Sequence, residues 1–109
     1  MPVREIAPTA LARRLSEPGE RPVLLDVRTP GEHALVALPD SLLVPLQEFA
    51  ERIAELEALQ GQEVVVYCHT GVRSFHAAAF LVTRGVQAAS LAGGIDRYAV
   101  EVDPSLPRY

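Results

Sequence analysis

Residues 64–74 read VVVYCHTGVRS, and this stretch decides the fold prediction. The run from Val64 to Tyr67 is continuously β-branched or aromatic, which is typical of a strand buried on both faces of a parallel sheet. An alanine-rich segment at residues 72–84 follows and predicts a helix, which ends at Gly85, a common residue just beyond a helix. Cys68 and the polar loop behind it therefore lie between a buried strand and a helix.

The rest of the chain alternates in the same way. Further strands are predicted at residues 3–6, 23–27, 42–44 and 88–91, and further helices from Pro8 onward and at residues 32–36, 46–59 and 95–100. Such alternation predicts an α/β fold with a mostly parallel sheet and helices on both faces. Within 46–59 the apolar residues recur at spacings of three and four, which indicates one amphipathic helix whose glutamates face solvent.

Length and composition limit the classes of function. A chain of 109 residues fits one domain, with a core at about residues 3–100 and a tail at 101–109 that has little drive to fold alone. Its 49% apolar and 22% charged residues fit a globular protein rather than a disordered one. A net charge of −4 argues against a general nucleic-acid binder, which usually carries a basic face.

Residues 1–14 carry four charges and no apolar run, so no signal peptide is expected there. The longest apolar runs are too short to cross a membrane, and the expected location is the cytoplasm. Cys68 is the only cysteine, which excludes an internal disulfide and any metal site built from several cysteines.

The loop after Cys68 has the composition of an anion-binding turn. Ligands of open α/β sheets bind at the carboxyl ends of the strands, where Cys68 is expected. Gly71 tolerates a positive φ, which lets successive backbone N–H groups converge. Ser74 is expected to bond a free N–H near the helix start. This polar flank is unsuited to a core, and it favours a functional thiol over a merely buried one.

Magnitudes indicate what would activate such a thiol. A free cysteine, with a pKa near 8.5, is only about 3% thiolate at pH 7. A two-unit fall in pKa needs about 2.7 kcal/mol. A helix dipole supplies about 0.3–1 kcal/mol, whereas each hydrogen bond to a charged group supplies about 1.5–3 kcal/mol. We therefore expect convergent N–H groups, more than the helix dipole, to lower the pKa of the thiol.

Asp26 interrupts an apolar run, so it needs a partner if it is buried. Arg28 lies on the same side of the strand and is the first candidate, and the cysteine loop is the second. We expect a structural role for this acid, ordering the loop. His33 and His76 have no thiol or carboxylate at ligand spacing, and we expect both to be ordinary surface or packing residues.

The pattern Cys68-x-x-Gly71-x-Arg73-Ser74 after a valine-rich strand resembles the active-site loop of rhodanese-like sulfurtransferases. Three further segments resemble this family in order and spacing: the Asp-x-Arg segment with its downstream acid at residues 25–32, Val44-Pro45-Leu46, and the Gly-Gly turn at residues 91–95. The resemblance covers about residues 3–100. It implies a rhodanese-like three-layer domain with a five-stranded, mostly parallel central sheet.

The resemblance also implies a chemistry. The Cys68 thiolate would take sulfane sulfur from a small anionic donor such as thiosulfate and pass it to a thiol, cyanide or protein acceptor. The cradle would be the backbone of His69, Thr70, Gly71, Val72 and Arg73, and the Arg73 guanidinium would be a further contact for the donor anion. The implied intermediate is a covalent persulfide on Cys68, with no cofactor and no metal.

One segment and two single residues depart from the family pattern. The segment at residues 36–41 reads VALPDS, where the family usually has Gly-His-Ile-Pro-Gly-Ala. His69 stands where the family often has arginine, and a histidine there would either weaken thiosulfate capture near neutral pH or make it dependent on pH. Tyr98 stands where the family usually has a tryptophan after the Gly-Gly turn, and it is a candidate for the mouth of the pocket.

Two other classes of function remain open from the sequence. One is a phosphatase or arsenate-reductase-like hydrolase on a related fold. Four residues separate Cys68 from Arg73, whereas such phosphatases use five for a wider cradle, so the spacing favours sulfur. The other is a rhodanese-like binding module without turnover, against which the intact Cys68, Gly71 and Arg73 argue.

Overall fold

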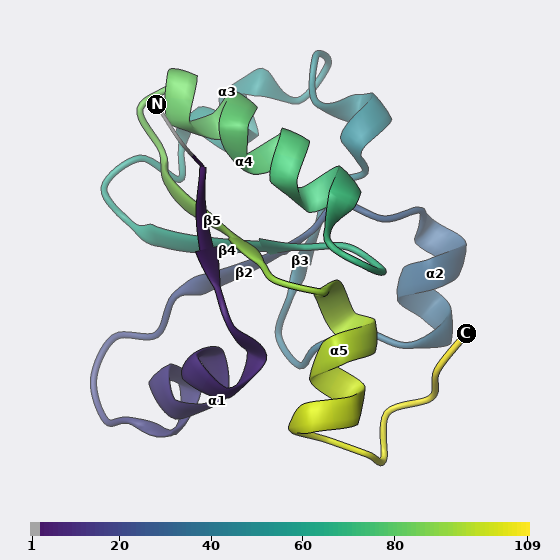
Figure 1. Cartoon of the computed structure of the whole chain (residues 1–109). Coiled ribbons are helices and arrows are strands. Elements are labelled where there is room, and N and C mark those ends of the chain that lie inside the picture. The colour runs from purple at the N-terminus through teal and green to yellow at the C-terminus, as the bar shows by residue number, and fades with distance from the viewer. Residues whose placement is uncertain (1–2) are drawn as a thin grey trace.

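The computed structural model of the chain describes residues 3–109 and shows one five-stranded sheet (Figure 1). Neighbouring strands are all parallel, in the order β1-β5-β4-β2-β3. The strands are β1 (Arg4–Ile6), β2 (Val23–Asp26), β3 (Leu42–Leu43), β4 (Glu63–Tyr67) and β5 (Gln87–Leu91). The predicted α/β class is confirmed, and β4, the strand before the cysteine, is central.

Helices cover both faces of this sheet. In Figure 1, α3 (Ile53–Glu57) and α4 (Val72–Thr83) lie above it, and α1 (Pro8–Ser16) and α5 (Gly94–Glu101) lie below it. The short α2 (Pro30–Leu35) follows β2. No helix within residues 3–109 is both long and apolar enough to cross a membrane.

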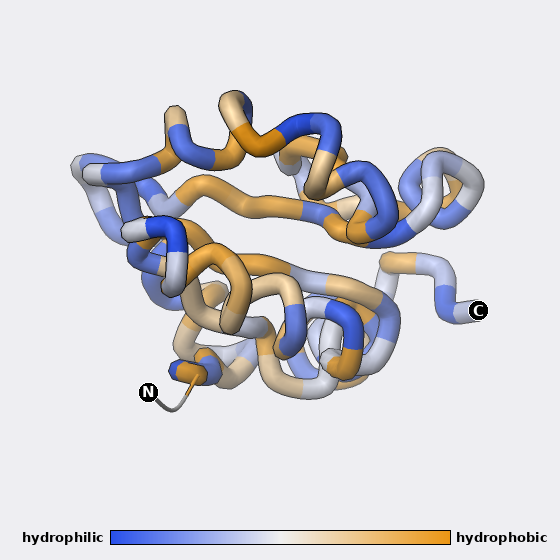
Figure 2. Tube along the Cα trace, turned by 90° about the horizontal axis from the view of Figure 1, so that it is seen from above, coloured by the Kyte–Doolittle hydropathy of each residue, from blue (hydrophilic) through white to orange (hydrophobic). Residues whose placement is uncertain are grey.

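The core divides into two clusters, one on each face. Val64, Val66 and Cys68 pack with α3 and α4, whereas the alternate residues Val65 and Tyr67 pack with α1 and α5. Both faces of β4 are buried, which explains its continuous apolar run. Figure 2, seen from above, shows long hydrophobic stretches through the middle of the molecule and hydrophilic stretches mostly at its margin.

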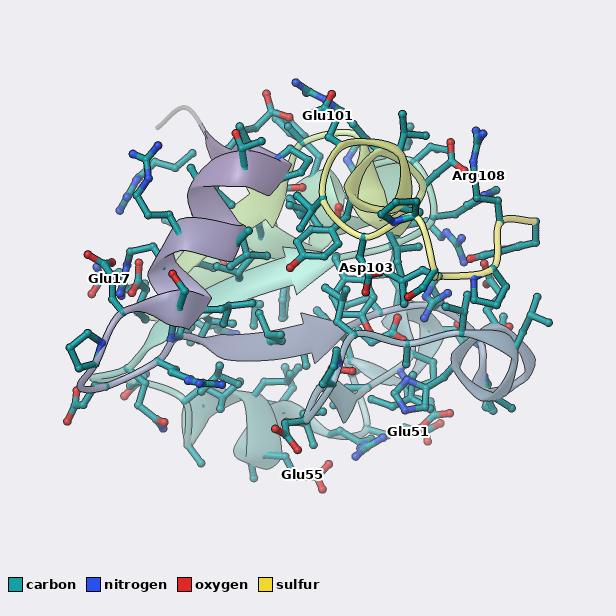
Figure 3. All side chains as sticks on the ribbon, turned by 90° about the horizontal axis from the view of Figure 1, so that it is seen from below. Glu17, Glu51, Glu55, Glu101, Asp103 and Arg108 are labelled. Atoms are coloured by element: carbon teal, nitrogen blue, oxygen red, sulfur yellow. The ribbon has the colours of Figure 1, made fainter. Side chains whose placement is uncertain are left out.

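The single helix predicted at residues 46–59 is wrong. The chain forms a 3₁₀ turn at Leu46–Glu48 and then the separate helix α3, and Arg52 between them has a non-helical backbone. Two short turns satisfy the apolar spacing as well as one helix does, because both bury their apolar side chains in the same cluster. Glu51 and Glu55 are exposed, as predicted for this segment, and lie at the margin of the molecule in Figure 3.

The tail, which we expect to have little drive to fold alone, packs in the structure against the rest of the chain. The N–H groups of Val102 and Asp103 donate to the carbonyl of Tyr98, and Leu106 joins the lower core cluster. Arg108 forms an ion pair with Asp96 of α5 at 2.9 Å. These contacts lead the chain back toward α2, where it ends in Figure 1.

Candidate active site

Cys68 lies directly after β4, at the carboxyl end of the sheet, as the sequence predicts. Its thiol is free and only 1% exposed. The N–H groups of Gly71 and Ser74 donate to its sulfur at 3.1 and 3.3 Å. The loop therefore curls around Sγ, and backbone donors converge on it.

Gly71 has the predicted positive φ, +103°. Space also favours glycine here, because a Cβ would lie 3.2 Å from the backbone nitrogen of Gly93, closer than an ordinary van der Waals contact. The absence of a side chain at this position therefore helps the loop to curl tightly.

The start of α5 holds the other side of the loop. The N–H groups of Ile95 and Asp96 donate to the carbonyls of Cys68 and His69 at 2.9 and 3.1 Å. A Cβ on Gly94 would overlap both of these carbonyl groups, so the Gly-Gly turn is needed for this close approach. Sequence reasoning found the turn but not its contact with the cysteine loop.

Four N–H groups of the loop are left without an acceptor. Among residues 3–109, the N–H groups of His69, Thr70, Val72 and Arg73 have no hydrogen-bond partner. They belong to the same loop as Gly71 and Ser74, whose N–H groups bind Sγ. The loop therefore retains hydrogen-bonding capacity next to a sulfur atom, which suits an anion.

The Ser74 side chain does not cap the helix, so that prediction is wrong. Gly71 is the residue at the cap position, and no side chain bonds the helix start. The Ser74 hydroxyl instead lies 3.4 Å from Cys68 Sγ and 2.7 Å from the hydroxyl of Ser90 on β5. Sequence reasoning missed Ser90, whose only signal was a polar residue in an apolar strand.

Arg73 is engaged by a carboxylate. Its guanidinium donates to both oxygens of Glu32, at 2.7 and 2.9 Å, and its side chain is 37% exposed. The hydrogen bonds from Arg73 lower the pKa of Glu32 well below its ordinary value. Thr29 fixes Glu32 further through a capping box at the start of α2. The predicted contact of Arg73 with a donor anion would have to replace this ion pair.

The predicted pairing of Asp26 with Arg28 is confirmed. The guanidinium donates to both carboxylate oxygens at 2.9 and 2.7 Å, and both side chains are fully buried. Burial alone would raise the pKa of Asp26, but the hydrogen bonds from Arg28 and His33 outweigh it and lower that pKa. His33, expected to be an ordinary surface or packing residue, lies with Nδ1 2.8 Å from Asp26.

The tail brings an unexpected aromatic residue over the loop. The ring of Tyr109 stacks on His69 with centroids 3.9 Å apart. Its hydroxyl donates to Glu32 at 2.7 Å and accepts from Arg28 at 2.9 Å. Burial raises the pKa of Tyr109, which keeps this hydroxyl protonated. His69 is thereby covered, and its Nε2 is buried without a partner among the described residues.

Tyr98, a candidate for the mouth of the pocket, lies elsewhere. It is 8% exposed and belongs to the core cluster on the α1 and α5 face. It lines a cavity of about 320 Å³ with residues of that face and the tail, and no residue of the cysteine loop contributes to this cavity. The N–H groups at the start of α5 contact the loop, whereas the side chain of Tyr98, further along the same helix, packs in the core cluster with Leu11 of α1.

The fold and the loop agree with known proteins. The family described as "Rhodanese-like domain" matches residues 7–101. The chain belongs to the rhodanese-like family. A protein named sulfurtransferase from Allochromatium vinosum is 37% identical to this rhodanese-like chain over 98 residues, which cover 89% of each protein.

Similar domains also occur within longer proteins. The Rhodanese-like/PpiC domain-containing protein 12 of Arabidopsis thaliana is 31% identical over 99% of this chain, but the chain spans only 38% of that protein. The solved structure of a rhodanese-related protein from Thermoplasma volcanium superposes with a TM-score of 0.80 at 28% identity, covering 91% of this chain and 93% of the other.

Replacing Gly94 with alanine should destabilise the protein far more than replacing Gly61. Both glycines have positive φ, so each substitution costs about 1 kcal/mol in backbone strain. Only at Gly94 does the new Cβ also meet the loop carbonyls, since the space around Gly61 is open. We expect a loss of about 3 kcal/mol or more for Gly94→Ala in urea unfolding. Equal losses for the two variants would contradict this account of the turn.

Acid should weaken the Glu32–Arg73 pair. The folded-state pKa of Glu32 lies below its ordinary value of 4.5, so its stabilisation is complete above that pH and is lost as the pH falls through the folded-state value. Between pH 6 and pH 3, Glu32→Gln should lose about 1 kcal/mol less unfolding free energy than the unchanged protein. The matched control is the exposed Glu20→Gln, which should follow the unchanged protein. A Glu32→Gln curve parallel to that of the unchanged protein would refute the coupling.

Proposed function

We propose that this protein is a sulfurtransferase whose Cys68 carries sulfane sulfur as a persulfide. One observation carries the proposal: two N–H groups of the loop bind Sγ, and the others, including those of Thr70, Val72 and Arg73, have no acceptor among the described residues. Membership of the rhodanese-like family and similarity to a sulfurtransferase support it.

The first half-reaction loads the cysteine. The Cys68 thiolate attacks the outer sulfur of an anionic donor such as thiosulfate, and a new S–S bond forms. The S–S bond of the donor breaks, and sulfite leaves with its electron pair. The negative charge moves to the outer sulfur of the persulfide, where the free N–H groups of Thr70, Val72 and Arg73 would stabilise it by about 1.5–3 kcal/mol each.

The second half-reaction unloads the cysteine. A nucleophilic acceptor, such as a thiolate or cyanide, attacks the outer sulfur and forms a bond to it. The persulfide S–S bond breaks, and its electron pair restores the Cys68 thiolate. The two steps balance without a redox cofactor or a metal ion.

Arg73 would guide the donor to the loop. Its guanidinium is partly exposed, and it is the cationic side chain adjacent to Ser74 in the loop. A donor with oxyanion groups would exchange with Glu32 for the same planar hydrogen-bonding face. Arg28 is fully buried against Asp26, so it would hold the structure rather than contact the donor.

Intact-protein mass after incubation with thiosulfate tests the proposal. We expect a gain of one sulfur atom that is removed by cyanide. Cys68→Ser should show no gain, while its circular dichroism spectrum stays that of the unchanged protein. Gly61→Ala, which lies away from the loop, should still take up sulfur.

Sulfur uptake by the Cys68→Ser variant would disprove the mechanism. If the unchanged protein gains no mass but hydrolyses an aryl phosphate, the hydrolase reading of the loop replaces this one. If the unchanged protein gains no mass and hydrolyses no aryl phosphate, thiosulfate is rejected as the donor.

A further inference from the structure

We propose that Ser90 is a positioning residue that directs the Ser74 hydroxyl to donate its hydrogen to the sulfur of Cys68. The inference rests on the proposed function, because it concerns the same sulfur atom. Ser90 Oγ lies 2.7 Å from Ser74 Oγ, which lies 3.4 Å from Cys68 Sγ. Ser74 and Ser90 are both fully buried.

The number of hydrogens on these three groups decides which of them donates. When Cys68 is a thiol, the two hydroxyl groups and the thiol carry three hydrogens, but only two contacts join the three groups. One hydrogen therefore has no acceptor among them. When Sγ has lost its hydrogen, two hydroxyl hydrogens remain for the two contacts. The Ser90 hydroxyl then donates to Ser74, and the Ser74 hydroxyl donates to Sγ. Because a buried donor without an acceptor is unfavourable, the arrangement favours the deprotonated sulfur.

The same order serves the loaded state. In a persulfide, Sγ again carries no hydrogen and can accept only. The Ser74 hydroxyl can then continue to donate to Sγ while the free N–H groups of the loop bind the outer sulfur. Ser90 would thus keep one orientation of Ser74 through both half-reactions.

The position of Ser90 and its hydrogen bonding suit this role. Its hydroxyl has no hydrogen-bond partner other than Ser74 within residues 3–109. It lies on β5 opposite Val66 of β4, so the sheet backbone fixes its position. A buried hydroxyl is unfavourable unless it is hydrogen-bonded, and the bond to Ser74 satisfies this one.

Charged groups also lie near the cysteine loop, and their influence on the acidity of the thiol must be distinguished from that of the two hydroxyl groups. Arg73 of α4 is paired with Glu32 of α2, and His69 lies close to Asp96 of α5. Tyr109 from the tail covers His69. A Ser90→Ala substitution leaves all these groups in place, so a change in the acidity of the thiol would report on the hydroxyl chain.

The test is the rate of Cys68 alkylation by iodoacetamide as a function of pH, since only the thiolate reacts. Ser90→Ala should shift the midpoint of the profile to higher pH and slow alkylation near neutral pH by about threefold to tenfold. Ser74→Ala should shift it at least as far. In the double variant, loss of Ser90 should add nothing, because the hydroxyl it directs is gone.

Ser41→Ala is the matched control. Ser41 is a partly buried serine whose hydroxyl bonds Tyr67 and the Leu38 carbonyl, away from the cysteine. Its removal should lower stability without moving the alkylation profile. A merely structural role for Ser90 would give the same result as Ser41→Ala.

An unshifted profile in Ser90→Ala overturns the inference, and so does a shift of equal size when Ser74 is already alanine. Alkylation needs no sulfur donor, so the two proposals fail separately. A shifted profile in a protein that takes up no sulfur from thiosulfate would support the role of Ser90 and contradict the proposed function. Sulfur uptake with an unshifted profile would do the reverse.

Discussion

The two hydrogen bonds from the start of α5 to the carbonyls of Cys68 and His69 orient the cysteine loop, and the rest of the site depends on them. Because the carbonyls face α5, the N–H groups that follow are left for the sulfur and for a bound anion. This close approach explains why glycine is needed at position 94. The loop is therefore shaped by a turn more than twenty residues further along the chain.

A second set of contacts surrounds the loop with balanced charge. The buried pair of Asp26 and Arg28 extends through the Tyr109 hydroxyl to Glu32, and Glu32 holds Arg73. The network joins the ends of β2 and β4 to the tail. It keeps one cation, Arg73, partly exposed beside the sulfur, where an incoming anion could exchange with a carboxylate.

Local patterns predicted the parts of this site that lie close together in the sequence. The apolar run of β4 placed Cys68, the glycine at position 71 predicted the curl, and strand alternation paired Asp26 with Arg28. The sequence could not reveal contacts made by the fold. The contacts of Ser90, Tyr109 and Tyr98 depend on which elements meet in space. The apolar spacing at residues 46–59 fits two short turns as well as one helix, so it could not distinguish them.

The most direct test of the central claim is a crystal structure of the protein after loading with thiosulfate. The account predicts an extra sulfur bonded to Cys68 Sγ, within hydrogen-bonding distance of the N–H groups of Thr70, Val72 and Arg73. An extra sulfur bound away from these groups, or a loop whose free N–H groups point away from it, would contradict the account.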